Sequence, residues 1–316
     1  MKTVPISGEF DLIKHIAASP IRKEVICGIG DDAAVIKYEN KFLLVTTDTI
    51  VEDDHFSFSY FTPEQVGIKA IESNLSDIAA MGGKPLYVLV SLVLKSDSTM
   101  HMVEGIYKGM RKRCKKYNVD IIGGDTTHGD VNVITITLIG ETDKKHLCMR
   151  KDAKAGDLVF VTGLLGASTA GLHLFRNGIK GFKKIKACHT TPQSRLDVSC
   201  EIAGYANAME DISDGLASEL RNISEQSKCG AIIYADKVPI DEQTHMAAQT
   251  CGEDALDFAL YGGEDFELVY TVSKERSEKA YGYCVGEITK GNGVYLKEDN
   301  KLTKLAKFGY DHFKKQ

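Results

Sequence analysis

Residues 62–94, TPEQVGIKAIESNLSDIAAMGGKPLYVLVSLVL, contain the clearest secondary-structure pattern in the chain. Thr62 and Pro63 are typical of a helix start, because threonine caps the first turn and proline fits its first position. The helix is predicted to run to about Met81 and to stop at the two glycines that follow. The apolar run at 87–94 then predicts a buried strand. A helix followed directly by a buried strand indicates a mixed fold of helices and sheets.

The same alternation continues on both sides of this stretch. Further elements are predicted at 41–47 (strand), 98–117 (helix), 120–124 (strand) and 132–140 (strand), with a loop, GGDTTHGD, between the last two. The segment 150–157 is polar and charged, and strands alternate with helices again after it. We therefore predict an α/β or α+β chain with two domains, 1–149 and 150–316.

Length and composition agree with a two-domain globular protein. The 316 residues are 43% hydrophobic and 26% charged, which is typical of soluble proteins. The formal net charge of −5 argues against nucleic acid as a partner. No apolar run approaches the ~20 residues that cross a bilayer, and no signal-peptide pattern occurs. Because the eight cysteines form no C-x-x-C pair, we expect a cytoplasmic protein with reduced thiols, no zinc site and no membrane partner.

Aspartates next to glycines and small polar residues are the unusual feature of the sequence. They occur in five segments, GIGDDA (28–33), TTDT (46–49), NLSDIAAMGG (74–83), GGDTTHGD (123–130) and DISDG (211–215). A surface carboxylate usually lies among lysine, glutamate and glutamine, whereas these lie where few neighbours can satisfy them. Mg²⁺ binds through carboxylates, water and substrate phosphates. We therefore predict that carboxylates from several of these segments converge on a magnesium site.

Each acidic segment also has a purely structural interpretation. Ser213 or Asp214 fits the N-cap of the next helix. Asp32 and Asp48 fit turns, in which aspartate is common. Asp77 is harder to explain in this way, because it lies beside the apolar face of a predicted helix. Five segments of one chemical kind are better explained by a shared site than by turns alone.

The common nucleotide-binding motifs are absent. GIGDDA matches the dinucleotide fingerprint G-x-G-x-x-A only formally, because its aspartates would repel a pyrophosphate and a strand follows instead of a helix. The sequence contains no G-x-x-x-x-G-K-[ST], H-E-x-x-H or G-x-S-x-G motif. ATP would therefore be bound without a P-loop, and no covalent nucleophile is indicated. His55, in VEDDHF, is a candidate for a phosphate contact, since the acids beside it favour its protonated form; a structural role is the alternative.

In these segments the sequence resembles the thiamine-monophosphate kinases, which belong to the superfamily of aminoimidazole ribonucleotide synthetase. The resemblance runs from GEFDLI (8–13) to GYDHF (309–313) and includes VTGLLGASTAGL and YGGEDFEL. It implies the two-domain fold of that synthetase, with N-terminal strands of two subunits forming a shared barrel in a homodimer. It also implies ATP-dependent phosphorylation of thiamine phosphate to thiamine diphosphate by direct in-line transfer, with several Mg²⁺ ions.

The resemblance further implies roles for the domains and for individual residues. The first domain would bind ATP and metal and form the dimer, and the second would complete the active site. The metal ligands would be Asp32, Thr46, Thr47, Asp48, Asp77, Asp125, Asp211 and Asp214. ATP would contact Tyr107, Gly124, Asp125, Arg150 and Ser213. The acceptor would contact His55, Glu264 and Tyr310. The residues most directly involved in catalysis would be Asp77, Asp125 and Asp214.

Two alternatives are weighed against this assignment. The first is another ATP-dependent enzyme of the same superfamily, for example one that makes selenophosphate or matures hydrogenases. The reactive cysteine that either would need, in an N-terminal glycine-rich segment or at the C-terminus, is absent. The second is a non-catalytic nucleotide-binding regulator, which should have lost several of the aspartates. The sequence departs from the pattern of the family it resembles in three places, namely at His128, at the pair Asp53 and Asp54 before His55, and at Phe266.

Overall fold

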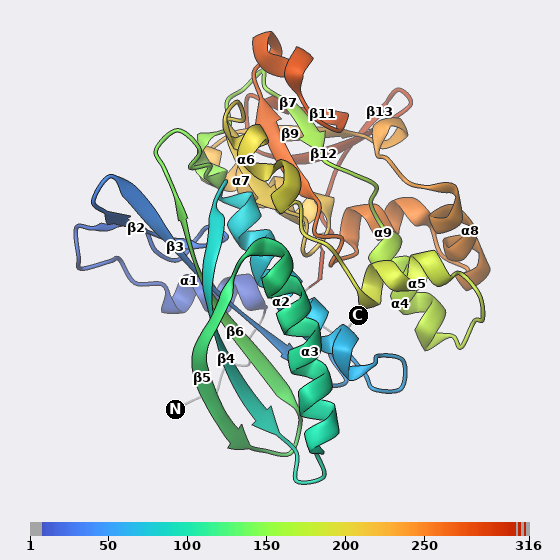
Figure 1. The fold of residues 1–316 in the computed structure, drawn as a ribbon. Helices are drawn as coiled ribbons and strands as arrows, with labels where there is room; N and C mark the ends of the chain where they lie inside the picture. Colours follow the sequence, from blue (N-terminus) through green and yellow to red (C-terminus); the bar gives the residue numbers. More distant parts are fainter. Residues whose placement is uncertain (1–7, 308, 311–312, 314–316) are drawn as a thin grey trace, which may run out of the picture.

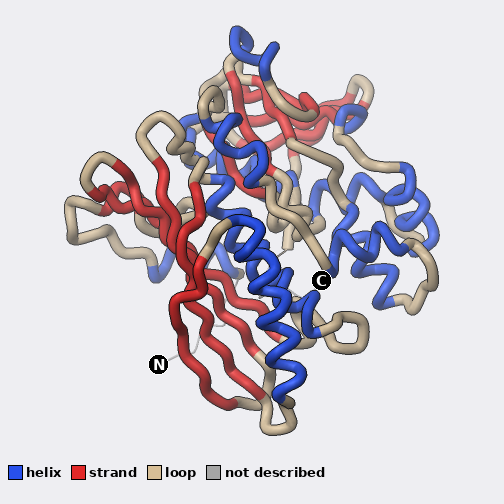
Figure 2. The backbone as a smooth tube through the Cα atoms, viewed as in Figure 1, coloured by secondary structure: helices blue, strands red, loops and turns tan. Residues whose placement is uncertain are grey.

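The computed structural model of the chain describes residues 8–307, 309, 310 and 313. Within this part, two β-sheets lie in different regions of the molecule and helices pack against both (Figure 1). Figure 2 shows the strands in red, one sheet at the lower left and the other at the top. The predicted mixture of helices and strands, α/β or α+β, is thus confirmed.

The N-terminal sheet has six strands in the order β1-β2-β3-β6-β4-β5. Their bounds are Val25–Cys27 (β1), Ala34–Tyr38 (β2), Lys41–Val51 (β3), Lys84–Leu94 (β4), Asp120–His128 (β5) and Val133–Thr142 (β6). Neighbouring strands are antiparallel except β4 and β5, which are parallel. The helix α3 (Met100–Tyr117) connects this pair, because parallel neighbours need a crossover. Figure 1 shows α2 and α3 on one face of the sheet.

The helix α2 (Pro63–Ala80) begins and ends where the sequence predicts. Thr62 and Gln65 form a capping box, in which each side chain accepts a hydrogen bond from the backbone N–H of the other. Gly82 follows the helix with a φ of +63°, and a Cβ there would lie 2.0 Å from a backbone carbonyl oxygen. Only glycine fits this turn, which leads directly into β4.

The helix α2 packs against both halves of the chain. Ile71, Leu75 and Ile78 belong to the core of the N-terminal sheet, together with buried residues of β4 and β6. Ala79 and Ala80, on the last turn, instead pack in a cluster with residues of the second sheet. Because α2 is buried from two sides, it can bring side chains into contact with groups from either half.

The second sheet has seven strands in the order β13-β12-β9-β11-β7-β10-β8. Their bounds are Leu158–Val161 (β7), Ala208–Asp211 (β8), Gly230–Tyr234 (β9), Leu268–Val272 (β10), Tyr283–Thr289 (β11), Gly293–Glu298 (β12) and Lys301–Lys304 (β13). The other α-helices are Glu9–Ile16 (α1), Ala167–Arg176 (α4), Lys183–Thr190 (α5), Leu196–Ala203 (α6), Leu216–Ser227 (α7), Glu242–Cys251 (α8) and Ala255–Tyr261 (α9). The 3-10 helices are Arg150–Asp152 (η1), Ala235–Lys237 (η2) and Lys274–Lys279 (η3).

The strand β5 differs from its prediction. It continues through the expected loop GGDTTHGD as far as His128, because it pairs in parallel with β4 along this length. Gly124, with a φ of +151°, makes the pairing possible, since a Cβ there would lie 1.8 Å from the carbonyl oxygen of Val90. Residues 122–128 are all exposed, so β5 forms a long open sheet edge. In the described part of the chain, neither sheet closes into a barrel.

None of the helices in the described residues combines the length and the apolar composition that crossing a membrane requires.

Candidate active site

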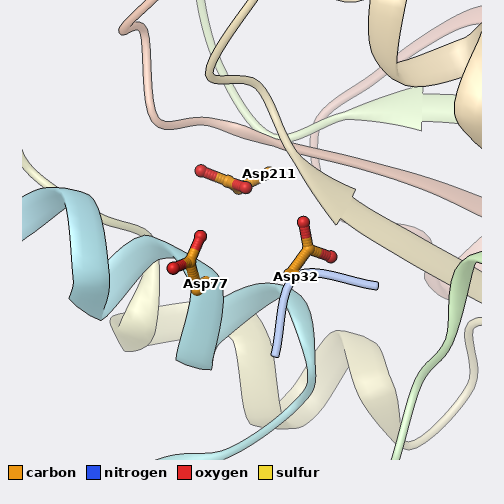
Figure 3. A group of neighbouring side chains, drawn as sticks. All are labelled: Asp32, Asp77 and Asp211. Atoms are coloured by element: carbon orange, nitrogen blue, oxygen red, sulfur yellow. The ribbon is translucent and has the colours of Figure 1, made fainter. Parts of the chain in front are cut away.

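Three aspartates from distant parts of the sequence meet between the two halves. Asp32 lies in the loop between β1 and β2, Asp77 on α2 and Asp211 at the end of β8. One carboxylate oxygen from each residue lies within 4.8 Å of those of the other two (Figure 3). The predicted convergence of aspartates is therefore seen for these three residues, and oxygen atoms at this spacing suit a hard divalent cation.

Hydrogen bonds hold two of these carboxylates in place. The Thr46 hydroxyl donates to Oδ2 of Asp77, and the Ser76 hydroxyl donates to Oδ2 of Asp211 at 2.6 Å. Oδ2 of Asp32 is different, because it is buried and has no hydrogen-bond partner among the described residues. A buried acceptor of this kind calls for an explanation, and a bound cation supplies one.

The electrostatics of the cluster also favour a cation. Burial and the neighbouring carboxylates raise the pKa of Asp77 and that of Asp211 well above their ordinary values. Burial likewise raises the pKa of Asp48, on β3, to about 6. Each shift means that a negative charge at this place is under-compensated by the protein. A divalent ion would remove that cost.

Arg150, at the start of η1, supplies part of the missing positive charge. Its Nη2 lies 2.6 Å from Oδ1 of Asp32 and 3.0 Å from Oε1 of Glu210. Burial alone would lower the pKa of Arg150, but these carboxylates outweigh it and raise the pKa. Glu210 is fully buried on β8 and also accepts a hydrogen bond from Asn222. Sequence reasoning missed Glu210, although an acid inside a short buried strand is a signal that could have identified it.

A cavity of about 360 Å³ extends from this cluster along α2. Lys69, Ser73 and Asp77, which lie on successive turns of one face of α2, all line it. Eight residues of α-helix span ~12 Å, so Lys69 lies at a second end of the cavity, away from the three-aspartate cluster. The lining also contains residues that the sequence analysis assigned to the site, namely Asp48, His55, Asp211, Ser213, Asp214, Glu264 and Tyr310.

The Lys69 end of the cavity carries the predicted acceptor residues. Nζ of Lys69 lies 2.6 Å from Oε1 of Glu264 and donates to the carbonyl oxygen of His55 at 2.7 Å. The Tyr310 hydroxyl donates to Asp54 at 2.9 Å, and burial together with Asp54 raises the pKa of Tyr310 to about 12. The structure thus brings the three predicted acceptor residues to one end of one cavity, and their contact with an acceptor stays a prediction.

The contacts of the His55 ring concern the prediction that this histidine is protonated and contacts a phosphate. The backbone N–H of Val51 donates to Nδ1 of His55 at 3.2 Å, so Nδ1 carries a lone pair in this arrangement. Asp54 lies 3.5 Å from the same nitrogen. The expectation that neighbouring acids favour a protonated His55 stays a prediction.

Other predicted residues lie away from the cluster within one chain. Thr47 points to the opposite sheet face from Thr46, where its hydroxyl donates to the carbonyl oxygen of Ile136. Gly124 and Asp125 lie on the exposed edge strand β5. Tyr107 lies on α3 and lines a separate cavity of about 490 Å³ with Arg111, whose guanidinium stacks over its ring. Asp214 differs from these residues, because it lines the same cavity as Asp77 and Asp211; it lies in the loop before α7, where its N–H donates to Glu219 at 2.8 Å. The roles of these residues stay predictions.

Comparison with known proteins shows the family to which the chain belongs. Residues 30–142 match the N-terminal domain of the AIR synthase related proteins and residues 154–297 match their C-terminal domain. The thiamine-monophosphate kinase of Bacillus subtilis is 41% identical, with 97% of this chain and 99% of that protein covered. The enzyme of Aquifex aeolicus is 36% identical, with 97% and 98% covered.

A solved structure described as AaThiL complexed with AMPPCP and TMP has a TM-score of 0.90 and 35% sequence identity to this chain. The match covers 99% of this chain and 100% of that one. The fold, the position of the acidic cluster and these relatives lead to one assignment. The chain belongs to the AIR synthase related proteins and, among them, to the family of thiamine-monophosphate kinases.

Proposed function

We propose that the chain transfers the γ-phosphoryl group of ATP to the phosphate of thiamine phosphate, giving thiamine diphosphate and ADP. The observation that carries this proposal is the cluster of Asp32, Asp77 and Asp211 at one end of a cavity that continues to Glu264. Such a cavity suits an acceptor with a phosphate at one end and a polar ring at the other. Relatives at 36–41% identity and the complex with AMPPCP and TMP support both substrates.

The cluster fits magnesium. Asp32, Asp77 and Asp211 would hold the ion, with Asp48 and Asp214 beside them, because all these groups offer oxygen ligands. In addition, Oδ2 of Asp32 has no hydrogen-bond partner within the described part of the chain. When bound, Mg²⁺ would neutralise charge on the phosphate groups of ATP and of the acceptor.

The side chains of the protein then act mainly by positioning. A phosphate monoester has a second pKa of ~6, so the acceptor oxygen is already ionised at neutral pH and needs no strong general base. Phosphoryl transfer depends on alignment and charge compensation more than on a nucleophilic side chain. We infer that Ser213 and Arg150 help to hold the donor, while His55, Glu264 and Tyr310 hold the acceptor. As the acceptor oxygen attacks the γ-phosphorus in line, the bond from this phosphorus to the oxygen that bridges it to the β-phosphate breaks, and ADP leaves.

We also propose that the active protein is a homodimer with a shared barrel, built by residues 1–149, while residues 150–316 complete each site. The strand β5 leaves a long edge exposed, and the unpaired backbone groups of such an edge can pair with a strand of another chain. The same strand carries Gly124 and Asp125, which lie away from the cluster within their own chain. Pairing of two N-terminal sheets would bring Asp125 of one subunit toward the cluster of the other.

The proposed reaction is tested by incubating the purified protein with ATP, MgCl₂ and thiamine phosphate and separating the products by chromatography. We expect magnesium-dependent thiamine diphosphate from thiamine phosphate, and none from unphosphorylated thiamine. An aminoimidazole-pathway substrate serves as a parallel control for the other enzymes of the superfamily. Turnover of that control instead, or ATP binding without turnover, would replace the proposal by one of the two alternatives.

Magnesium is expected to stabilise the protein more at high pH than at low pH. Burial raises the pKa of Asp48 to about 6 and, with the charge of Asp32, that of Asp31 to about 7. Carboxyl groups whose pKa is raised by folding stabilise the fold below pH 4, and this contribution is lost as the pH rises through 6 to 7. The metal-free protein is therefore destabilised over that interval, and the charge that destabilises it also attracts Mg²⁺.

This expectation is measured by thermal unfolding with EDTA or with MgCl₂ at matched ionic strength, between pH 5.5 and pH 8. A ligand at a hundred times its Kd adds ~2.7 kcal/mol, which corresponds to roughly 4 °C for a chain of this size. We expect a shift of that order at pH 8 and less than half of it at pH 5.5. Equal shifts at both pH values would contradict the role of these carboxylates.

A further inference from the structure

Lys69 is a buried cation between two acceptor residues that the proposed function uses. Its side chain is 1% exposed, and burying an ammonium group is costly unless it is paired. Nζ lies 2.6 Å and 2.8 Å from the two carboxylate oxygens of Glu264 and donates to the carbonyl oxygen of His55 at 2.7 Å. Glu264 comes from the C-terminal half, 195 residues away in sequence. One lysine therefore connects the acceptor residues of both halves.

The backbone around Glu264 is fixed independently of Lys69. Glu264 has a φ of +66°, a conformation that is uncommon for a residue with a side chain. Its N–H donates to the carbonyl oxygen of Ser213 at 2.7 Å. A Cβ on the preceding Gly263 would lie 2.3 Å from the same oxygen, so only glycine allows this approach. The turn is thus anchored on the loop that follows Asp211, and Lys69 has only to orient the Glu264 side chain.

The contacts of Lys69 also set the charge of Glu264. Burial opposes ionisation of this carboxyl group, but the Lys69 ammonium and the His189 ring outweigh burial and hold its pKa below its ordinary value. His189 itself is buried, with Nδ1 3.4 Å from Oε2 of Glu264. The Glu264 side chain is 27% exposed and lines the cavity. An ionised carboxylate has about four lone-pair positions. Glu264 can therefore accept hydrogen bonds from a ligand in addition to its contacts with Lys69 and His189.

We propose that Lys69 is a positioning residue for the acceptor: it orients Glu264 and fixes the His55 loop, so that Glu264 accepts hydrogen bonds from the ring end of the acceptor. This inference rests on the proposed function and assigns Glu264 to a part of the acceptor with N–H donors, such as an amino-substituted heterocycle. The phosphate end, ~12 Å away along α2, would not depend on Lys69. Lys69 therefore affects acceptor recognition and leaves ATP binding unchanged.

Lys69→Met tests this proposal because methionine keeps most of the length and volume of the side chain and removes the charge. A hydrogen bond to a charged group contributes enough for a roughly 10- to 100-fold change in affinity. We expect KM for thiamine phosphate to rise by about that factor, while kcat and KM for ATP change less than about threefold. The dissociation constant of unphosphorylated thiamine, which lacks the phosphate end, should rise by the same factor in calorimetry.

Glu72→Gln is the matched control for loss of a buried charge on the same helix. Glu72 is fully buried and pairs with Arg113 at 2.9 Å and with Ser194 at 2.7 Å, outside the cavity lining. This variant should lower the thermal unfolding temperature and leave KM for thiamine phosphate unchanged. If both variants changed KM equally, or if Lys69→Met changed only stability, Lys69 would have a structural role and the proposal would be wrong.

The double variant Lys69→Met/Glu264→Gln tests whether Lys69 acts through Glu264. We expect its KM for thiamine phosphate to equal that of Glu264→Gln alone, since a residue that acts through another adds nothing after its partner is changed. If the KM of the double variant instead rose by the product of the factors of the two single variants, the proposal would be wrong. Calorimetry distinguishes failure of the Lys69 proposal from failure of the proposed reaction. Wild-type protein that binds thiamine phosphate but does not turn it over would contradict the reaction alone. Wild-type protein that binds neither thiamine compound would overturn both.

Discussion

Replacing Asp77 with asparagine is expected to lower kcat for thiamine diphosphate formation by at least about 10²–10³-fold, the usual cost of removing one electrostatic contact to a transition state. The Asp77 carboxylate contributes an oxygen to the only three-aspartate cluster of this spacing in the described residues. It accepts a hydrogen bond from Thr46, and the asparagine carbonyl can accept the same bond. The substitution therefore removes charge while it keeps shape.

The same substitution is expected to stabilise the metal-free fold. Neighbouring carboxylates and burial raise the pKa of Asp77, which means that its ionised form is unfavourable where it lies. Asparagine removes this penalty, so the unfolding temperature in EDTA at pH 8 should rise, and the Mg²⁺-dependent shift should shrink. A variant that is inactive because it is misfolded would instead unfold at a lower temperature.

Asp236→Asn provides the control for this experiment. Asp236 is exposed in η2 and lies outside the cavity lining, so its loss should leave kcat and the response to Mg²⁺ unchanged. Near-wild-type turnover of Asp77→Asn would exclude Asp77 from the proposed magnesium site. If Asp77→Asn lost turnover but its unfolding temperature still rose with Mg²⁺ as in the wild type, Asp77 would act in the reaction and would not contribute to metal affinity.

The sequence was most informative where local signals agree with the fold. The capping box of α2 and the glycines after it are local, so both ends of this helix could be predicted. The end of β5 could not, because glycines, threonines and an aspartate are typical of turns. In the structure, parallel pairing with β4 overrides that preference, and the absent side chain of Gly124 allows the strands to approach.

For the site, the chemistry of the aspartates could be predicted and their partners could not. Asp32, Asp77 and Asp211 stand out because they lie among small residues. Lys69 does not, since a single lysine on a helix usually indicates a solvated face. Its burial results from the contact with Glu264, and no local pattern contains a contact between residues 195 positions apart.

Asp125 is the residue whose position in one chain fits its predicted role least. It pairs with Ser91 of β4, which lies opposite Thr135 of β6 and, beyond that, Thr49 of β3. Neighbouring strands lie ~4.8 Å apart, so about 14 Å of sheet separates Asp125 from β3. Asp125 therefore lies on an open edge strand, while Thr46 and Asp48, on β3, lie at the cluster and its cavity. A second subunit paired along β5 would remove this separation.

A mixture of Asp125→Asn and Asp77→Asn subunits is expected to regain about one quarter of wild-type activity, although each variant alone is inactive. Random pairing makes half of the dimers mixed. In a symmetric dimer whose sites take Asp77 from one subunit and Asp125 from the other, one of the two sites in each mixed dimer is intact. If Asp125 served its own chain, every site would lack one aspartate and mixing would restore nothing. Because both subunits are folded and differ only at these carboxylates, recovered turnover after mixing would be evidence for a site shared across the dimer.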